Sequence, residues 1–209
     1  GDDSYVVSAV LEHFHIDSRV LPTDTPEGHM AANSHINTEV CYPLRGVVGD
    51  TIGFLKQEKE KHGPEYVNNK YMVMLPSAGG PCRYGKYREL IRIFMDEDGF
   101  EKIPVEGPSA EVGYTDLPLP GGNGAISHKK LMELLYRGIY SADLLEDITL
   151  RFRPYTKVPS DADELKTRKL RDLCSCISMG ESLSSLQYWA EETVRSFKRL
   201  DIEEKRRFP

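Results

Sequence analysis

Most apolar residues of this chain recur at the spacing of a helix. Residues 4–15 place Val6, Val10 and Phe14 on one stripe, as in an amphipathic helix. On the same ground we expect further helices over residues 43–61, 83–98, 127–152 and 161–200. The last of these ranges should hold one long helix or a helix pair. Gly138 should break the third of these, because glycine is a poor helix former.

Two short apolar runs predict strands. Residues 71–75 (YMVML) are continuously apolar, as in a strand buried on both faces of a parallel sheet. Residues 102–106 form the next candidate strand, with the predicted helix 83–98 between them. Strand, helix and strand over so few residues indicate a βαβ unit with parallel strands. A further short strand is expected at residues 19–22, after the first helix.

This alternation of helices and strands predicts an α/β fold. We expect a Rossmann-like parallel sheet with flanking helices over residues 1–110. A Pro- and Gly-rich stretch at 107–124 should then divide the chain. The remaining residues, 111–209, should form the connection and a mostly helical part.

Composition and charge narrow the class of protein. The chain has 209 residues, 39% of them hydrophobic, and a formal net charge of −6. A nucleic-acid-binding protein is usually basic, so we do not expect nucleic acid as a partner. No apolar run approaches the roughly 20 residues that a membrane helix needs, and no secretory leader is visible. We therefore expect a cytoplasmic protein.

Cysteine chemistry is the clearest functional signal in the sequence. Cys41 and Cys82 each come just before a predicted helix, with Arg45 and Arg83 nearby. A helix N-terminus favours negative charge, and basic neighbours favour the thiolate form of cysteine. Such a pair suits an anionic or soft-metal ligand. The alternative, that each cysteine only fills a small space at a tight turn, stays open.

The loop around Cys82 also matches part of a phosphate-binding motif. Residues 80–86 (GPCRYGK) have the G-x-x-x-x-G-K spacing after a predicted strand. However, Tyr87 stands where a serine or threonine should bind magnesium, and Pro81 lacks a backbone N–H. These residues argue against ATP or GTP binding. Gly80 would instead let a bulky group approach the backbone.

Together the two cysteine segments resemble a known family. The first has the pattern E-x-C-x-P-x-(K/R)-x-x-x-G, formed by Glu39, Cys41, Pro43, Arg45 and Gly49. The second, G-P-C-R-x-G-x-Y, is formed by Gly80, Pro81, Cys82, Arg83, Gly85 and Tyr87, with Phe100 at the expected helix exit. This pair resembles the uncharacterised domain of CoA-substrate-specific enzyme activases. Those proteins are related to the 2-hydroxyacyl-CoA dehydratase and benzoyl-CoA reductase systems.

The resemblance implies a role in electron transfer. Cys41 and Cys82 would be thiolate ligands of an iron–sulfur cluster, which the isolated domain need not retain. Arg45, Arg83 and Gly80 would lie beside this cofactor, the arginines offsetting its charge. The partners implied are an ATPase activator domain or a dehydratase subunit, with acyl-CoA as a further candidate. Because the ATPase motif of the family is missing, we expect no activity from this chain alone and assign no catalytic residue.

Other ligands and another function remain open at this point. Cys174 and Cys176 could complete a cluster, although Cys174 lies on an apolar helical stripe. His29 or His35 could join the two cysteines in a zinc site. Alternatively, the chain is a non-catalytic docking or CoA-binding module of a larger protein, with structural cysteines.

Overall fold

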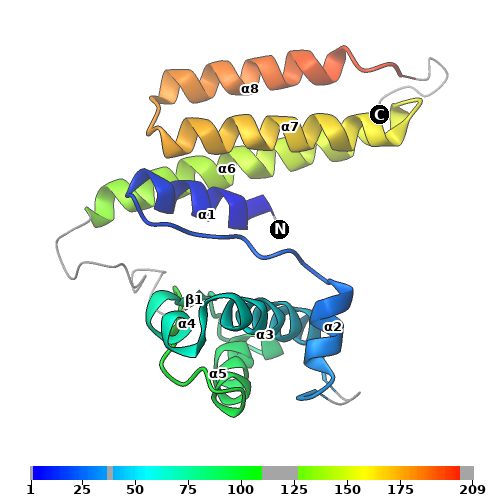
Figure 1. The fold of residues 1–209 in the computed structure, drawn as a ribbon. Helices are drawn as coiled ribbons and strands as arrows, with labels where there is room; N and C mark the ends of the chain where they lie inside the picture. Colours follow the sequence, from blue (N-terminus) through cyan, green and yellow to red (C-terminus); the bar gives the residue numbers. More distant parts are fainter. Residues whose placement is uncertain (1, 37–39, 110–126, 203–209) are drawn as a thin grey trace. The chain divides into compact units, whose positions relative to one another are not determined.

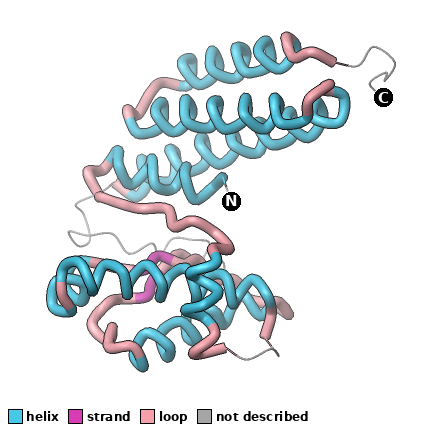
Figure 2. Tube along the Cα trace, turned by 45° about the vertical axis from the view of Figure 1, so that its right-hand side comes forward, coloured by secondary structure: helices cyan, strands magenta, loops and turns pink. Residues whose placement is uncertain are grey.

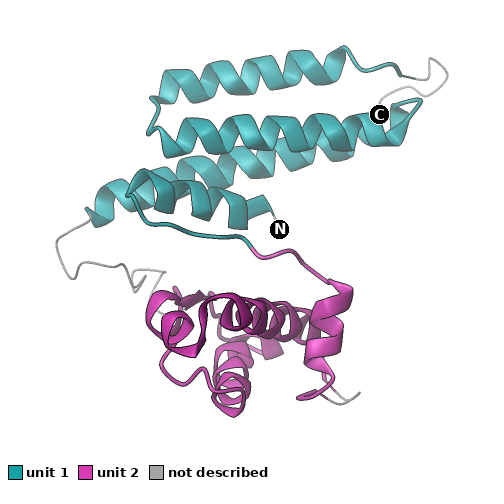
Figure 3. Cartoon of the chain, in the orientation of Figure 1, with its two compact units in different colours: residues 1–20, 120–209 teal, residues 21–119 magenta. Residues whose placement is uncertain are grey.

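The fold was obtained as a computed structural model, which describes residues 2–36, 40–109 and 127–202. Chain contacts divide it into two compact units. Unit 1 comprises residues 1–20 and 120–209, and unit 2 comprises residues 21–119 (Figure 3). These bounds differ from the expected division at residue 110, because the first helix packs with the C-terminal helices.

Unit 1 is built from α1 (Asp2–His13), α6 (His128–Phe152), α7 (Pro159–Ser178) and α8 (Leu183–Lys198), with the short 3₁₀ helix η3 (Arg153–Tyr155). α1 packs against both α6 and α7, and α8 packs against α6 and α7 (Figure 1). Its buried side chains include Val6 and Val10 of α1 and Trp189 of α8. The expected helical C-terminal part is therefore present, and it includes the N-terminal helix.

Local sequence explains where the helices of unit 1 begin. The hydroxyls of Ser127 and Ser182 accept hydrogen bonds from the first turns of α6 and α8, which satisfies N–H groups that the helix itself leaves free. Pro159 opens α7, where a missing N–H costs nothing.

The predicted break at Gly138 is wrong, because α6 runs through it. A Cβ there would lie 2.4 Å from Val6 Cγ1, so this glycine makes room for α1.

Unit 2 contains α2 (Pro26–Ala32), α3 (Tyr42–His62), α4 (Pro64–Lys70), β1 (Val73–Met74), η1 (Arg83–Lys86), α5 (Tyr87–Glu97) and β2 (Val105–Glu106). α2 packs along α3, which also contacts α4 and α5. One apolar core joins these elements, with Ile52, Ile91 and Phe100 fully buried. Cys41 and Tyr84 pack against this core.

The predicted Rossmann-like parallel sheet with flanking helices is wrong. Within the described residues the only sheet is the pair β1–β2, two residues long in each strand, and helices make up nearly all regular structure (Figure 2). Residues 19–22 form no strand. The run 71–75 is not buried on both faces, since Met72 is 37% exposed and its neighbours are half-buried. A central strand of a larger sheet could not remain so exposed.

The predicted βαβ connection is nevertheless present. β1 pairs with β2 in parallel, with Val73 opposite Val105. A single parallel bridge, between Ser77 and Ser109, extends this pairing. The chain between the strands carries η1 and α5. The loop that follows β1 therefore begins at the carboxyl end of a parallel strand, and it holds Cys82. No described helix is long and apolar enough to cross a membrane.

Candidate functional site

Cys41 lies at the start of the longest helix of unit 2. It is the N-cap residue of α3, and its side chain makes no capping bond to the helix backbone. Its sulfur instead lies 2.9 Å from the hydroxyl oxygen of Tyr87. The residue is half-buried. Cys41 thus has a polar partner from another element rather than a purely apolar surrounding.

Cys82 is exposed, in the loop between β1 and η1. The expected α-helix does not begin directly after it. Arg83–Lys86 form a four-residue 3₁₀ helix, and α5 starts at Tyr87. Gly80 has φ +95° with open space where a side chain would be, so this position requires glycine for its backbone conformation. The loop presents the thiol of Cys82 to solvent.

Tyr87 connects the two cysteine segments. It is the first residue of α5 and is 3% exposed. Burial, followed by the hydrogen bond with Cys41, raises the pKa of Tyr87 to about 12, and negative charge on Cys41, on Cys82 and on Tyr84 adds to this effect. Both cysteines therefore lie close enough to act on one phenol. Cys41 thus contacts Tyr87 directly, whereas Cys82 acts on the same phenol only through its charge.

The two arginines near these cysteines form no ion pair with a carboxylate of the part of the chain that the structure describes. Arg45 donates to the side-chain oxygen of Asn33, a neutral group. Arg83 is exposed. Among the described residues, neither arginine has a carboxylate within ion-pair distance, whereas Lys86 pairs with Glu89 at 3.0 Å. The segment around Cys41 and Cys82 thus keeps positive charge available for an anionic group.

The two loop histidines face carboxylates rather than cysteines. His29 lies 2.7 Å from Asp24. Each ring nitrogen of the buried His35 faces a carboxylate, with Glu97 at 2.9 Å and Asp98 at 2.7 Å. Neither geometry supports the zinc site with Cys41 and Cys82.

No group of three or more histidine, cysteine or acidic side chains suited to a metal ion occurs in residues 2–36, 40–109 and 127–202. Glu39, the first residue of the family pattern, lies outside the described residues.

The remaining cysteines belong to unit 1. Cys174 and Cys176 both lie in α7 and are half-buried. Burial, together with the charges of Asp2 and Glu12, raises the pKa of Cys174 to about 11. Burial also raises the pKa of Cys176. At both side chains, burial therefore disfavours the thiolate, which is the form that binds metal.

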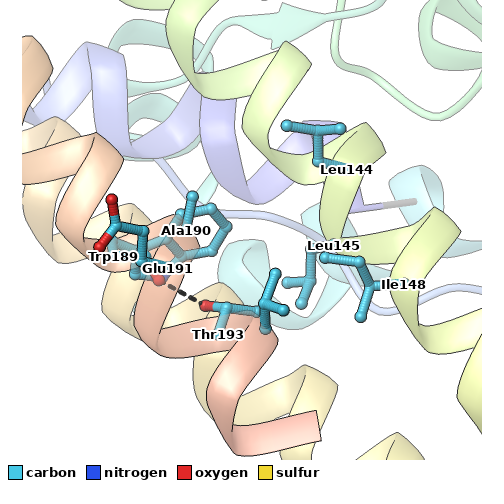
Figure 4. A pocket seen from close by; sticks show the side chains of 8 residues that line it. Leu144, Leu145, Ile148, Trp189, Ala190, Glu191 and Thr193 are labelled. Atoms are coloured by element: carbon cyan, nitrogen blue, oxygen red, sulfur yellow. Dashed lines mark hydrogen bonds between the residues drawn. The ribbon is translucent and has the colours of Figure 1, made fainter. Parts of the chain in front are cut away.

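Unit 1 also contains a groove of about 250 Å³ between α6 and α8. Figure 4 shows Leu144, Leu145 and Ile148 of α6 on one side and residues of α8, including Trp189 and Ala190, on the other. The Thr193 hydroxyl donates to the Trp189 carbonyl oxygen at 2.8 Å. The lining is almost entirely apolar and brings no nucleophile or ligand set to the groove.

Comparison with known proteins adds no family to this picture. Neither family models, nor curated proteins, nor solved structures give a match to the chain.

Proposed function

We propose that Cys41 and Cys82 supply two thiolate ligands of an iron–sulfur cluster for electron transfer. The chain would act within a redox system of the 2-hydroxyacyl-CoA dehydratase and CoA-substrate-specific enzyme activase type. The observation that carries this proposal is Tyr87, which lies 2.9 Å from the sulfur of Cys41 and within electrostatic reach of Cys82. The similarity of the two cysteine segments to that family supports it.

The donor set fits a shared cluster. Iron–sulfur clusters are commonly held by four cysteine thiolates, and unit 2 offers Cys41 and Cys82. The other two thiols of the chain lie in unit 1, where burial disfavours their thiolate form. The remaining ligands would come from a partner, such as the ATPase activator domain or the dehydratase subunit. When bound, the cluster supplies one-electron chemistry.

The protein's own residues would bind and orient this group. Cys41, packed against the core of unit 2, provides a fixed ligand, and the exposed Cys82 provides one that can reach a partner. Arg45 and Arg83 would offset negative charge on the thiolates and cluster. The Gly80 turn keeps the second loop open at the approach to Cys82.

Anaerobic reconstitution with ferrous iron and sulfide tests the proposal. With excess dithiothreitol to stand in for the partner's thiolate ligands, we expect the wild-type chain to become brown and to retain iron after desalting into the same thiol. The Cys41→Ser/Cys82→Ser double variant should lose that iron, because a serine hydroxyl is a much poorer iron ligand than a thiolate. Cys174→Ser is the matched control and should retain it. Equal iron in the double variant and the wild type would refute the ligand assignment.

A second candidate is a CoA-binding module without a cluster. The observation that favours it is the pair of guanidinium groups, Arg45 and Arg83, that lack carboxylate partners among the described residues and could bind CoA phosphates. The colour after reconstitution and the calorimetry of CoA binding separate the two candidate functions. A protein that stays colourless after reconstitution, and whose calorimetric CoA binding weakens in Arg83→Gln, would support the second function.

A further inference from the structure

The Tyr87 hydroxyl faces the sulfur of Cys41 across two different elements. Tyr87 opens α5, whereas Cys41 caps α3, and 2.9 Å separates the oxygen from the sulfur. The phenol ring is held in place, since it belongs to the apolar core of unit 2 and makes an edge contact with Tyr84 at 5.2 Å between ring centres. The core therefore fixes where this hydroxyl lies.

The direction of this hydrogen bond follows from the state of the sulfur. A thiolate carries no proton and can only accept, so the phenol O–H must be the donor whenever Cys41 is ionised. Hydrogen bonds to an ionised acceptor are roughly twice as strong as neutral ones. The contact is partly buried, because Tyr87 is 3% exposed and Cys41 is half-buried. Cys82, exposed in its loop, has no such hydrogen-bond partner among the described residues.

We infer that Tyr87 is a positioning residue for metal binding. Its hydroxyl donates a hydrogen bond to the Cys41 thiolate and orients that sulfur toward the metal. The inference rests on the proposed role of Cys41 as a ligand. Groups that hydrogen-bond to metal ligands fix the ligand's orientation, and removing them typically lowers metal affinity about 10- to 100-fold. Hydrogen bonds to the sulfurs also tune the electronic properties of iron–sulfur sites.

Titration with Co²⁺ alone tests this inference, because cobalt bound to thiolate has a charge-transfer absorption band. Tyr87→Phe removes one hydroxyl and keeps the ring. We expect it to weaken Co²⁺ binding about 10- to 100-fold. We also expect the band to move to longer wavelength, because the sulfur electrons lose the stabilising hydrogen bond. Tyr66→Phe, the same change in α4 of unit 2, should leave affinity and band unchanged.

A double variant separates positioning from a general loss of folding. If Tyr87 acts through Cys41, adding Tyr87→Phe to Cys41→Ser should weaken the remaining Co²⁺ binding no further. Circular dichroism establishes that each variant is folded. A Tyr87→Phe variant with wild-type affinity and an unmoved band, alongside a Cys41→Ser variant that binds weakly, would overturn the inference and leave the proposed function standing. A wild-type spectrum without a thiolate band would overturn both.

Discussion

Gly28 and Gly49 lie opposite each other where α2 packs on α3. A Cβ at Gly49 would lie 2.0 Å from the Gly28 carbonyl oxygen, which is backbone and cannot rotate away. Gly46 and Gly53 share the same stripe of α3, but a Cβ there would meet its neighbours at 3.8 and 3.7 Å. Of the three glycines on this stripe of α3, only Gly49 is required by the close approach of α2.

Alanine substitutions should separate these glycines. Gly49→Ala forces α2 and α3 apart, and overpacking of this kind costs about 1–3 kcal/mol. Gly53→Ala fits without a clash and should stabilise the helix by up to about 1 kcal/mol. Urea denaturation of both variants measures the free energies of unfolding. Equal effects at the two positions would contradict the described packing of α2 on α3.

The residues of the candidate site could be predicted only in part. Cys41 and Cys82 stood out because each precedes a predicted helix and has a basic neighbour. Tyr87 entered the prediction as the last residue of the G-P-C-R-x-G-x-Y pattern, and the structure shows it to be buried. Its contact with Cys41 joins residues 46 positions apart, and no periodic pattern carries such long-range information. The carboxylate partners of His35 were missed for the same reason.

At the scale of elements, helical periodicity was the reliable signal and short apolar runs were not. The predicted helices over residues 4–15, 43–61 and 127–152 correspond closely to α1, α3 and α6. The Rossmann-like sheet failed because a short apolar run looks the same in a wide sheet and in a two-residue ladder. α2 and α4 were missed, since each spans seven residues, too few to show a helical period.

Glu58 links α3 to the segment that enters β1, and this link should depend on pH. Its carboxylate accepts hydrogen bonds from Tyr71 Oη at 2.8 Å and from Lys61 Nζ at 2.9 Å. The bonds from Lys61 and Tyr71 lower the pKa of Glu58 below 4.5. A lowered folded-state pKa means that the stabilisation is present above pH 4.5 and is lost as the pH falls through the folded-state value.

Glu58→Gln tests this link. Above pH 4.5, the variant should unfold at lower urea concentration than the wild type, because glutamine cannot offer a charged acceptor. The difference between the two proteins should shrink as the pH falls further, since the wild-type carboxylate becomes protonated. Because the other carboxylates titrate in both proteins, their effects cancel in the difference in stability between the wild type and the variant. A difference that stays constant from pH 7 to about pH 3 would contradict the assignment.

At the scale of the whole molecule, unit 1 is assembled from both ends of the described chain. α1 contributes Val6, Val10 and Leu11 to the interior, and His13 Nδ1 lies 3.1 Å from the Ser178 carbonyl oxygen at the end of α7. The expected division into residues 1–110 and 111–209 placed α1 with its neighbours in sequence. An amphipathic stripe shows that a helix needs a partner, but it does not say which one.

Leu11→Ala should therefore destabilise the C-terminal helices. Leu11 is 5% exposed, and truncation of a buried leucine costs about 2–5 kcal/mol. Trp189, the single tryptophan of the chain, lies in α8 of unit 1, so its fluorescence follows the unfolding of this unit. Tyr5→Ala, at a 51% exposed position of the same helix, should change stability by no more than about 0.5 kcal/mol. If the fluorescence-monitored unfolding transitions of the Leu11→Ala variant and the wild type were indistinguishable, α1 would not be part of unit 1.

The split composition of unit 1 has a consequence during synthesis on the ribosome. α1 leaves the exit tunnel before unit 2 does, yet α6 and α7 are translated only after the whole of unit 2. At ~5–20 residues per second, the nascent helix waits on the order of ten seconds for them. Throughout that interval Val6 and Val10 have no permanent cover, while unit 2 is already complete. Chaperones that bind apolar nascent segments therefore have a long opportunity to bind α1.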